Sequence, residues 1–363
     1  MAIAPAASRQ RNQAMECLKM IAAVLVVILH VPFPGRWEEF VTYLADFTVP
    51  VFFMITGYFN YGADSKTLVR RLKHLLKLYV VTIAVSYFLG AVLTELQGGS
   101  TIAFLRTFTP DLEELMHWIV VHQDPRNGQL WYLTATCFCY LVLWAYVRFF
   151  GKKEVSYHSL YYGAFSLFVV FFTVTVLAET QGLRIPCNIY ENGYFKGLPL
   201  FTLGIFLHEY QEQIFENCQL TSRKLTVLLL GGAALVFAQG ASKVGVGNMA
   251  LGTLIEAPAI MLLLIRHPVL TTRSGFVSSC IGKFGALSTW MYLMHMQVLV
   301  IYEALIQPGL VSWLGESEAW WRPVLVVLLS FMTALLFTWG EGILRRLGKR
   351  RASPKTSQRR LAP

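Results

Sequence analysis

The sequence is poor in charged residues and lacks the long polar stretches of a soluble protein. Only 14% of its 363 residues are charged and 55% are hydrophobic, whereas soluble domains carry about 25% charged residues. There is no N-x-S/T sequon, no CxxC pair, no Cys/His spacing typical of a metal site and no G-x-S-x-G serine elbow. The shortage of charge indicates a membrane protein, and the lack of sequons favours a bacterial one.

What the chain has instead is a series of long apolar runs. A helix that crosses the hydrocarbon core needs about 20 mostly apolar residues. We therefore predict an all-α, polytopic membrane protein with about ten transmembrane helices. The sixth of them, 193–210, is the weakest, since it contains Lys196, Pro199 and three glycines. The predicted segments are 15–33, 38–61, 75–96, 129–150, 159–180, 193–210, 224–242, 248–266, 285–306 and 323–344.

The basic residues predict the orientation of these helices. Most of the 31 Lys and Arg residues fall into the connections that are cytoplasmic if the N-terminus is inside. Both termini and the basic loop 66–77 are then expected in the cytoplasm, and the long loop 97–128 outside. Arg9 and Arg11 precede the first run as in a signal peptide, but no small-residue cleavage site follows.

This reading divides the chain into three parts. They are a cytoplasmic N-terminal segment (1–14), a transmembrane domain (15–347) and a basic cytoplasmic tail (348–363). We expect the tail to lie against anionic lipid rather than nucleic acid.

The first apolar run contains a cation and an imidazole, in the stretch KMIAAVLVVILH from Lys19 to His30. Eleven residues make about three helical turns, so both side chains lie on one helix face, about 16 Å apart along the axis. Lys19 could simply snorkel to the inner interface, and His30 could be a satisfied interfacial histidine. Ionisable groups inside a membrane nevertheless mark functional sites by default, and the pair favours a site that runs through the membrane.

Two acidic residues also lie in or next to apolar segments. Asp46 precedes Pro50, which is expected to bend or break the second segment. Asp46 is expected near the outer membrane interface, at the same depth as His30. Its carboxylate could therefore orient the His30 imidazole and raise the basicity of that ring, or Asp46 could be a solvated residue at the helix start. Glu256 lies inside the eighth segment, where snorkelling does not explain it, and we expect it to face a cavity.

The remaining polar candidates are spread over three segments. Trp131 begins the fourth segment and could belong to an interfacial aromatic belt. Lys196 could pair with Glu191 or line a pocket. In the ninth segment Ser288, Tyr292 and His295 form one polar stripe, for which interhelical hydrogen bonding is the simpler explanation at Ser288 and Tyr292.

Several of these stretches together resemble the membrane-bound acyltransferase 3 family of bacterial integral-membrane O-acyltransferases. The first is a Lys or Arg followed, after ten residues, by His, which is Lys19 and His30 here. The others are VPVFFMITGYF, GQLWYL and STWMYLMH, with Thr56 where the family often has serine. The resemblance covers about Met15 to Leu347, and this chain has Lys19 where arginine is more common.

The resemblance implies an enzyme that transfers an acyl group, most simply acetyl, from cytoplasmic acyl-CoA to a hydroxyl of a cell-surface or lipid-linked glycan. Lys19, Arg70 and Arg71 would bind CoA, and no metal is implied. His30 would act as general base or carry a transient acyl-imidazole, supported by Asp46 or Glu256. The residues expected to contact substrate or the oxyanion are Trp131, Lys196, Ser288, Tyr292 and His295. The protein would be a multi-pass component of the bacterial cytoplasmic membrane, with the bilayer, acyl-CoA and a glycan acceptor as partners.

Two other functions compete with this one. A transporter or exporter of a sugar, an amino acid or an acylated polymer could line its path with the same polar groups, although paired broken helices in an inverted repeat are not visible. A receptor or scaffold would have no need of Lys19, His30 and Glu256 at three membrane depths.

Overall fold

The computed structural model describes residues 12–107, 109–124, 127–150, 156–183, 187–242, 249–269 and 275–352. Within these ranges the chain is helical and contains no strand, as expected. The segment before Asn12 and the tail from Ser353 lie outside the described residues. So do several basic residues used to predict the orientation: Arg126, Lys152, Lys153, Arg184, Lys243 and Arg273.

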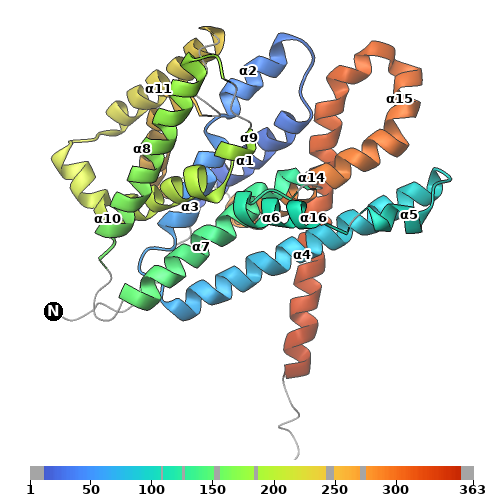
Figure 1. Ribbon diagram of the computed structural model, residues 1–363, viewed down its shortest axis with the longest axis horizontal. Helices are drawn as coiled ribbons and strands as arrows, with labels where there is room; N and C mark the ends of the chain where they lie inside the picture. Colours follow the sequence, from blue (N-terminus) through green and yellow to red (C-terminus); the bar gives the residue numbers. More distant parts are fainter. Residues whose placement is uncertain are drawn as a thin grey trace, which may run out of the picture.

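The helices form one bundle, from which the C-terminal half of α16 projects (Figure 1). The α-helices are α1 (Gln13–His30), α2 (Arg36–Ala45), α3 (Thr48–Tyr58), α4 (Ser65–Leu96), α5 (Thr101–Arg106), α6 (Leu112–Val121), α7 (Trp131–Phe150), α8 (His158–Thr180), α9 (Cys187–Tyr190), α10 (Leu198–Asn217), α11 (Ser222–Ser242), α12 (Thr253–Arg266), α13 (Gly275–Ile281), α14 (Phe284–Ile301), α15 (Gln307–Leu314) and α16 (Glu318–Ala352). Short 3₁₀ or π turns join some of them: η1 (Gly128–Leu130), η2 (Gly193–Gly197), η3 (Tyr302–Ile306) and η4 (Gly315–Ser317).

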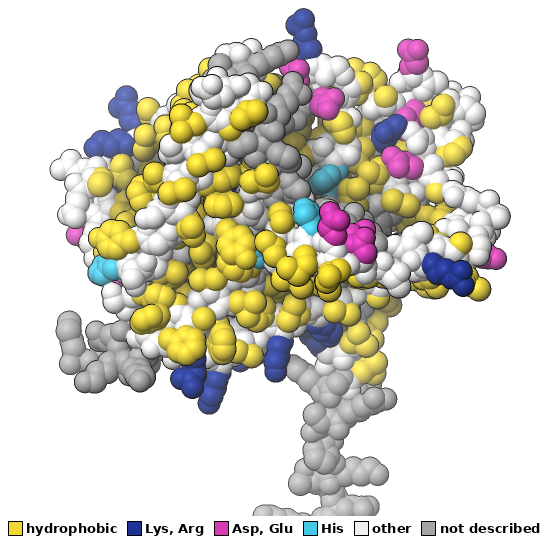
Figure 2. All heavy atoms as spheres, in the orientation of Figure 1, with side chains coloured by type: hydrophobic (Ala, Val, Ile, Leu, Met, Phe, Trp, Pro, Cys, Tyr) yellow, Lys and Arg dark blue, Asp and Glu magenta, His cyan; other side chains and the backbone are white. Residues whose placement is uncertain are grey.

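Seven stretches of the described residues are long and apolar enough to cross a membrane. The longest, Phe284–Leu347, contains both α14 and α16, whereas α10 and the 14-residue α12 are not among the seven. Figure 2 shows a broad hydrophobic surface, with Lys and Arg side chains along the lower edge of the view. The protein is therefore a multi-pass membrane protein. A helix lies in each of the ten predicted segments, but seven stretches of the described residues qualify as spans, so the count of ten stays a prediction.

α1 and α14 lie side by side and run in the same direction. Asn12 caps α1 by accepting a hydrogen bond from the Met15 amide at 2.9 Å. At this end, Glu16 packs so closely on Gly285 that a Cβ there would lie 2.0 Å from its carboxylate. At the other end, His30 meets His295. The parallel packing thus aligns two segments that are about 265 residues apart in the sequence.

The second predicted segment is broken, as Pro50 suggested, but the break comes earlier. α2 ends at Ala45 and α3 begins at Thr48, so Pro50 lies in the first turn of α3. Proline is favoured there because the amides of a first turn have no partner within the helix. Asp46 and Phe47 form the junction.

α3 and α10 cross at unusually close range. A Cβ on Gly57 would lie 1.8 Å from the Phe201 carbonyl oxygen, and one on Gly204 would lie 2.0 Å from that of Met54. Small residues at such crossings let two backbones approach. The crossing fixes α3, which forms one wall of the cavity described below.

Two of the expected connections are structured. The predicted loop 66–77 is wrong as a loop, because α4 begins at Ser65 with Asp64 as its N-cap. The region 97–128 contains α5 and α6, and both α6 and the residues after it contact the middle of α4. Trp118 of α6 stacks on Tyr79 at 5.7 Å, and the Tyr79 hydroxyl donates to Asp124, after α6, at 2.8 Å. The aromatic stack and this hydrogen bond fold a segment that looked like a simple external loop into the bundle.

Candidate functional site

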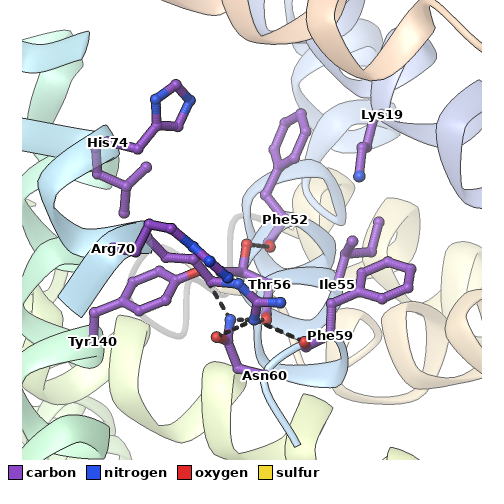
Figure 3. Close-up of a pocket in the computed structure, with 11 residues that line it drawn as sticks. Lys19, Phe52, Ile55, Thr56, Phe59, Asn60, Arg70, His74 and Tyr140 are labelled. Atoms are coloured by element: carbon purple, nitrogen blue, oxygen red, sulfur yellow. Dashed lines mark hydrogen bonds between the residues drawn. The ribbon is translucent and has the colours of Figure 1, made fainter. Parts of the chain in front are cut away.

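A cavity of about 570 Å³ opens between α1, α3, α4 and α7 (Figure 3). Lys19 on α1 approaches it from one side, and Arg70 and His74 on α4 approach it from the other. Its lining residues are Lys19, Phe52, Ile55, Thr56, Phe59, Asn60, Arg70, Arg71, His74, Leu75 and Tyr140. We call it the basic cavity, since Lys19, Arg70 and Arg71, the three residues expected to bind CoA, all line it.

Hydrogen bonds hold one of these cations in place. Arg71 donates to the Phe59 carbonyl at 2.9 Å and to the Asn60 side-chain oxygen at 2.6 Å. The Asn60 amide donates in turn to the Tyr140 hydroxyl at 2.9 Å (Figure 3). Because its position is fixed before any ligand arrives, the Arg71 guanidinium loses little conformational freedom on binding an anion.

Lys19 has a carboxylate partner within its own helix. Its ammonium lies 3.4 Å from Glu16, which is only 6% exposed, and 5.6 Å from the centre of the Phe59 ring. Arg70 is more exposed, and it donates a hydrogen bond to the Thr67 hydroxyl at 3.4 Å. Lys19 and Arg70 therefore both line the cavity, Lys19 as one partner of an ion pair and Arg70 in a more exposed position.

The two histidines predicted on separate helices meet at the far end of α1. The ring centres of His30 and His295 are 5.0 Å apart, with the rings tilted by 37°. His30 is exposed on its other side, whereas His295 is 0% exposed. His295 Nδ1 lies 2.6 Å from the Tyr292 carbonyl oxygen.

An aromatic wall connects the histidines with the basic cavity. The Tyr292 ring lies 6.0 Å from His295 and 5.6 Å from Tyr132. The Tyr132 hydroxyl is 3.3 Å from Thr56, which lines the cavity. A chain of direct contacts thus leads from the region of Lys19 to His30.

Trp131 and Lys196 lie beside this wall. The Lys196 ammonium sits 5.8 Å from the centre of the Trp131 ring, and Trp131 in turn contacts Phe53 at 6.1 Å. Lys196 is 8% exposed, so its ammonium is buried beside the Trp131 ring.

Lys196 belongs to η2. His122, which follows α6, helps to hold η2 in place. His122 adopts a left-handed conformation (φ 63°), and its Nδ1 accepts a hydrogen bond from the Gly193 amide at 3.2 Å. Its ring packs against those of Phe138 and Tyr194, which also contact each other. Burial lowers the pKa of His122 from 6.5 to about 4, so the neutral form that accepts this bond predominates at neutral pH.

The remaining predicted residues have other contacts. Asp46 accepts hydrogen bonds from the Ala250 amide at 3.2 Å and from the Thr253 hydroxyl, at the start of α12. Glu256, 6% exposed, lies on the same helix near Asp46. No hydrogen bond within the described ranges joins Asp46 to His30. Ser288 donates to the Gly285 carbonyl of its own helix at 3.1 Å, as in the simpler explanation.

Sequence reasoning missed several residues that shape the site. Glu16 could have been found, since it lies three residues before Lys19, a spacing at which opposite charges pair on a helix. Asn60, His74, Tyr132 and Tyr140 gave no such signal, because their roles depend on packing between helices that are distant in the sequence.

Comparison with known proteins gives one match. A family model described as an acyltransferase domain matches residues 12–340, which include the basic cavity, the aromatic wall and both histidines. Searches of curated proteins and of solved structures found no match.

Proposed function

This chain belongs to the acyltransferase family whose domain spans residues 12–340, and on that premise we propose that it acylates a cell-surface or lipid-linked glycan with acyl-CoA as donor. The family makes it a membrane acyltransferase of the O-acyltransferase kind. Acetyl is the simplest acyl group, a glycan hydroxyl is the proposed acceptor, and the proposed location is the cytoplasmic membrane of a bacterium.

The observation that carries the proposal is the connection between the basic cavity and His30. CoA carries phosphates at one end and the thioester at the other, with an extended arm between them. Lys19, Arg70 and Arg71 offer charge-assisted hydrogen bonds of the kind that phosphates favour. Lys19 and His30 are about 16 Å apart along α1, and contacts among Thr56, Tyr132 and Tyr292 link the basic cavity to His295, which faces His30.

In the proposed reaction His30 is the general base. It takes the proton of the acceptor hydroxyl as the hydroxyl oxygen attacks the thioester carbon. The carbon–sulfur bond then breaks, the proton passes from His30 to the departing sulfur, and the products are an ester and free CoA. His30 is suited to this role because one side is exposed to an incoming acceptor and the other rests against the protein.

The test uses the purified full-length protein in detergent or nanodiscs. Acetyl-CoA should raise its melting temperature, because a ligand that binds only the native state stabilises it. His30→Ala should keep this shift but reduce kcat for acyl transfer by about 10²- to 10⁴-fold, as expected for a lost acid–base group. Wild-type kcat in His30→Ala contradicts the catalytic assignment.

The acceptor is identified in cells. Mass spectrometry of surface glycans from cells with and without the gene should show an acyl mass that disappears with the gene. If acetyl-CoA neither stabilises the protein nor is consumed, and labelled sugar crosses vesicles that contain it, the transporter alternative is correct. An acyl-imidazole at His30, trapped without acceptor, would replace the general-base route with the covalent one.

A further inference from the structure

His30 has a neighbour that the sequence did not assign to it. Asp46, the carboxylate expected to orient the imidazole, is hydrogen-bonded to the start of α12. The group that faces His30 is His295, with 5.0 Å between the ring centres. An imidazole ring therefore lies where the sequence suggested a carboxylate.

The hydrogen bonding of His295 decides which of its nitrogens carries the proton. Nδ1 lies 2.6 Å from the Tyr292 carbonyl oxygen, which can only accept a hydrogen bond, so Nδ1 must be the donor. In the neutral ring Nε2 then carries the lone pair. The ring is 0% exposed, and its Nε2 has no hydrogen-bond partner among the described residues.

A buried acceptor without a partner is destabilising, because it has given up its hydrogen bonds to water without gaining one in the protein. Such groups are uncommon in folded proteins and call for a specific explanation. The donor best placed for this acceptor is a ring N–H of His30. In a working site, a small rotation of the exposed His30 side chain would close the contact.

The ring of His295 is held in a fixed position, so that it can orient the side chain of His30. The hydroxyl of Tyr292, one turn earlier on α14, donates to the Gln129 carbonyl at 2.5 Å. At the other end of α14, Gly285 packs directly on Glu16 of α1. The two helices thus hold His295 opposite His30, whose own side chain has room to move.

We propose that His295 is the positioning residue for His30 and that its unprotonated Nε2 accepts a hydrogen bond from one nitrogen of the His30 ring. The second His30 nitrogen then presents its lone pair to the exposed side, where the acceptor hydroxyl arrives. When His30 takes the hydroxyl proton, the positive charge is shared along the hydrogen bond to His295 Nε2. The same proton later returns through His30 to the CoA sulfur, so His295 ends each cycle unchanged. This inference rests on the proposed acyl transfer.

Two amide substitutions separate positioning from packing. The amide of His295→Asn reaches the position of Nδ1 and can still donate to the Tyr292 carbonyl, but it ends short of His30. The amide of His295→Gln reaches the position of Nε2 and can accept a hydrogen bond from His30. His295→Ala removes both contacts, and Thr289→Ala, which alters an exposed residue of α14, is the control.

The measurements are kcat and KM for acyl transfer, with the acetyl-CoA shift in melting temperature as a check on folding and donor binding. We expect His295→Ala and His295→Asn to lose about 10- to 100-fold in kcat, as when a group that orients a functional histidine is lost. Their KM for acyl-CoA and their thermal shift should stay at wild-type values. His295→Gln should regain at least tenfold over the alanine variant, and Thr289→Ala should match wild type.

Two results overturn the inference while the proposed function stands: wild-type kcat in His295→Ala, or higher activity in His295→Asn than in His295→Gln. The second result would mean that only the bond to Tyr292 matters. If the wild-type protein shows neither acyl transfer nor stabilisation by acetyl-CoA, the proposed function is wrong, and so is the role of His295 that rests on it.

Discussion

At the scale of single residues, Lys19 illustrates how a cation can be kept within an apolar helix. Its ion pair with the buried Glu16 and its contact with the Phe59 ring hold the ammonium at the edge of the basic cavity. Snorkelling alone needs neither partner. The surroundings of Lys19 fit an anion-binding role, which substitutions can test.

We expect Lys19→Ala to raise the KM for acyl-CoA by about 10- to 100-fold, since losing a charge-assisted contact costs about 1.5–3 kcal/mol. Lys19→Arg should stay close to wild type. Because Lys19→Ala also removes the ion pair with Glu16, the double variant Glu16→Gln/Lys19→Ala should recover melting temperature without recovering KM. An unchanged KM in Lys19→Ala would return Lys19 to a purely interfacial role.

His122 makes stability depend on pH. Burial lowers its pKa from 6.5 to about 4 in the folded protein, so between these values the unfolded chain binds more protons than the folded one. The stability is therefore complete above about pH 6.5 and falls as the pH drops towards 4. In His122→Asn, which tolerates the left-handed backbone, the melting temperature should fall less steeply across this window. Equal slopes for the two proteins would exclude His122 as the cause.

At the scale of elements, the crossing of α3 and α10 depends on glycine. Gly57 and Gly204 each face a backbone carbonyl at a distance that no side chain allows. The crossing positions Phe53 against Trp131 and Tyr132, and so supports the aromatic wall. The separation of these two helices therefore bears directly on the site.

Gly204→Ala should force α3 and α10 apart and cost about 1–3 kcal/mol, as overpacking does. The matched control is Gly231→Ala in α11, where a Cβ would meet nothing within 4 Å, and alanine is intrinsically the better helix former. Melting temperature should fall in the first variant and stay level or rise in the second. A similar change in both would show that the close crossing adds no constraint.

At the scale of the whole molecule, α4 offers a direct test of orientation. Its 32 residues span about 48 Å, more than the roughly 30 Å of a hydrocarbon core. Its basic N-terminal turns face the basic cavity, and the exposed Ser100 lies just beyond its other end. The proposed entry of CoA from the cytoplasm requires the Lys66 end to be inside.

Single cysteines in a cysteine-free background can locate the two ends of α4. A membrane-impermeant thiol reagent should label Ser100→Cys in intact cells, and it should label Lys66→Cys only after lysis. Labelling after lysis confirms that each introduced thiol is reactive. The reverse labelling pattern would show that the protein has the opposite orientation in the membrane. It would also rule out entry of CoA into the basic cavity from the cytoplasm.

The sequence alone indicated the long apolar segments and that Lys19 and His30 share a face of the first one. Both are local properties, since apolar run length and a spacing of eleven residues depend only on the helix that contains them. Packing decided the rest. Asp46 bonds to residues about 200 positions away, the chain after α6 folds back onto Tyr79, and His30 meets His295 rather than a carboxylate. Such pairings follow from how helices distant in the sequence align side by side, which no local pattern specifies.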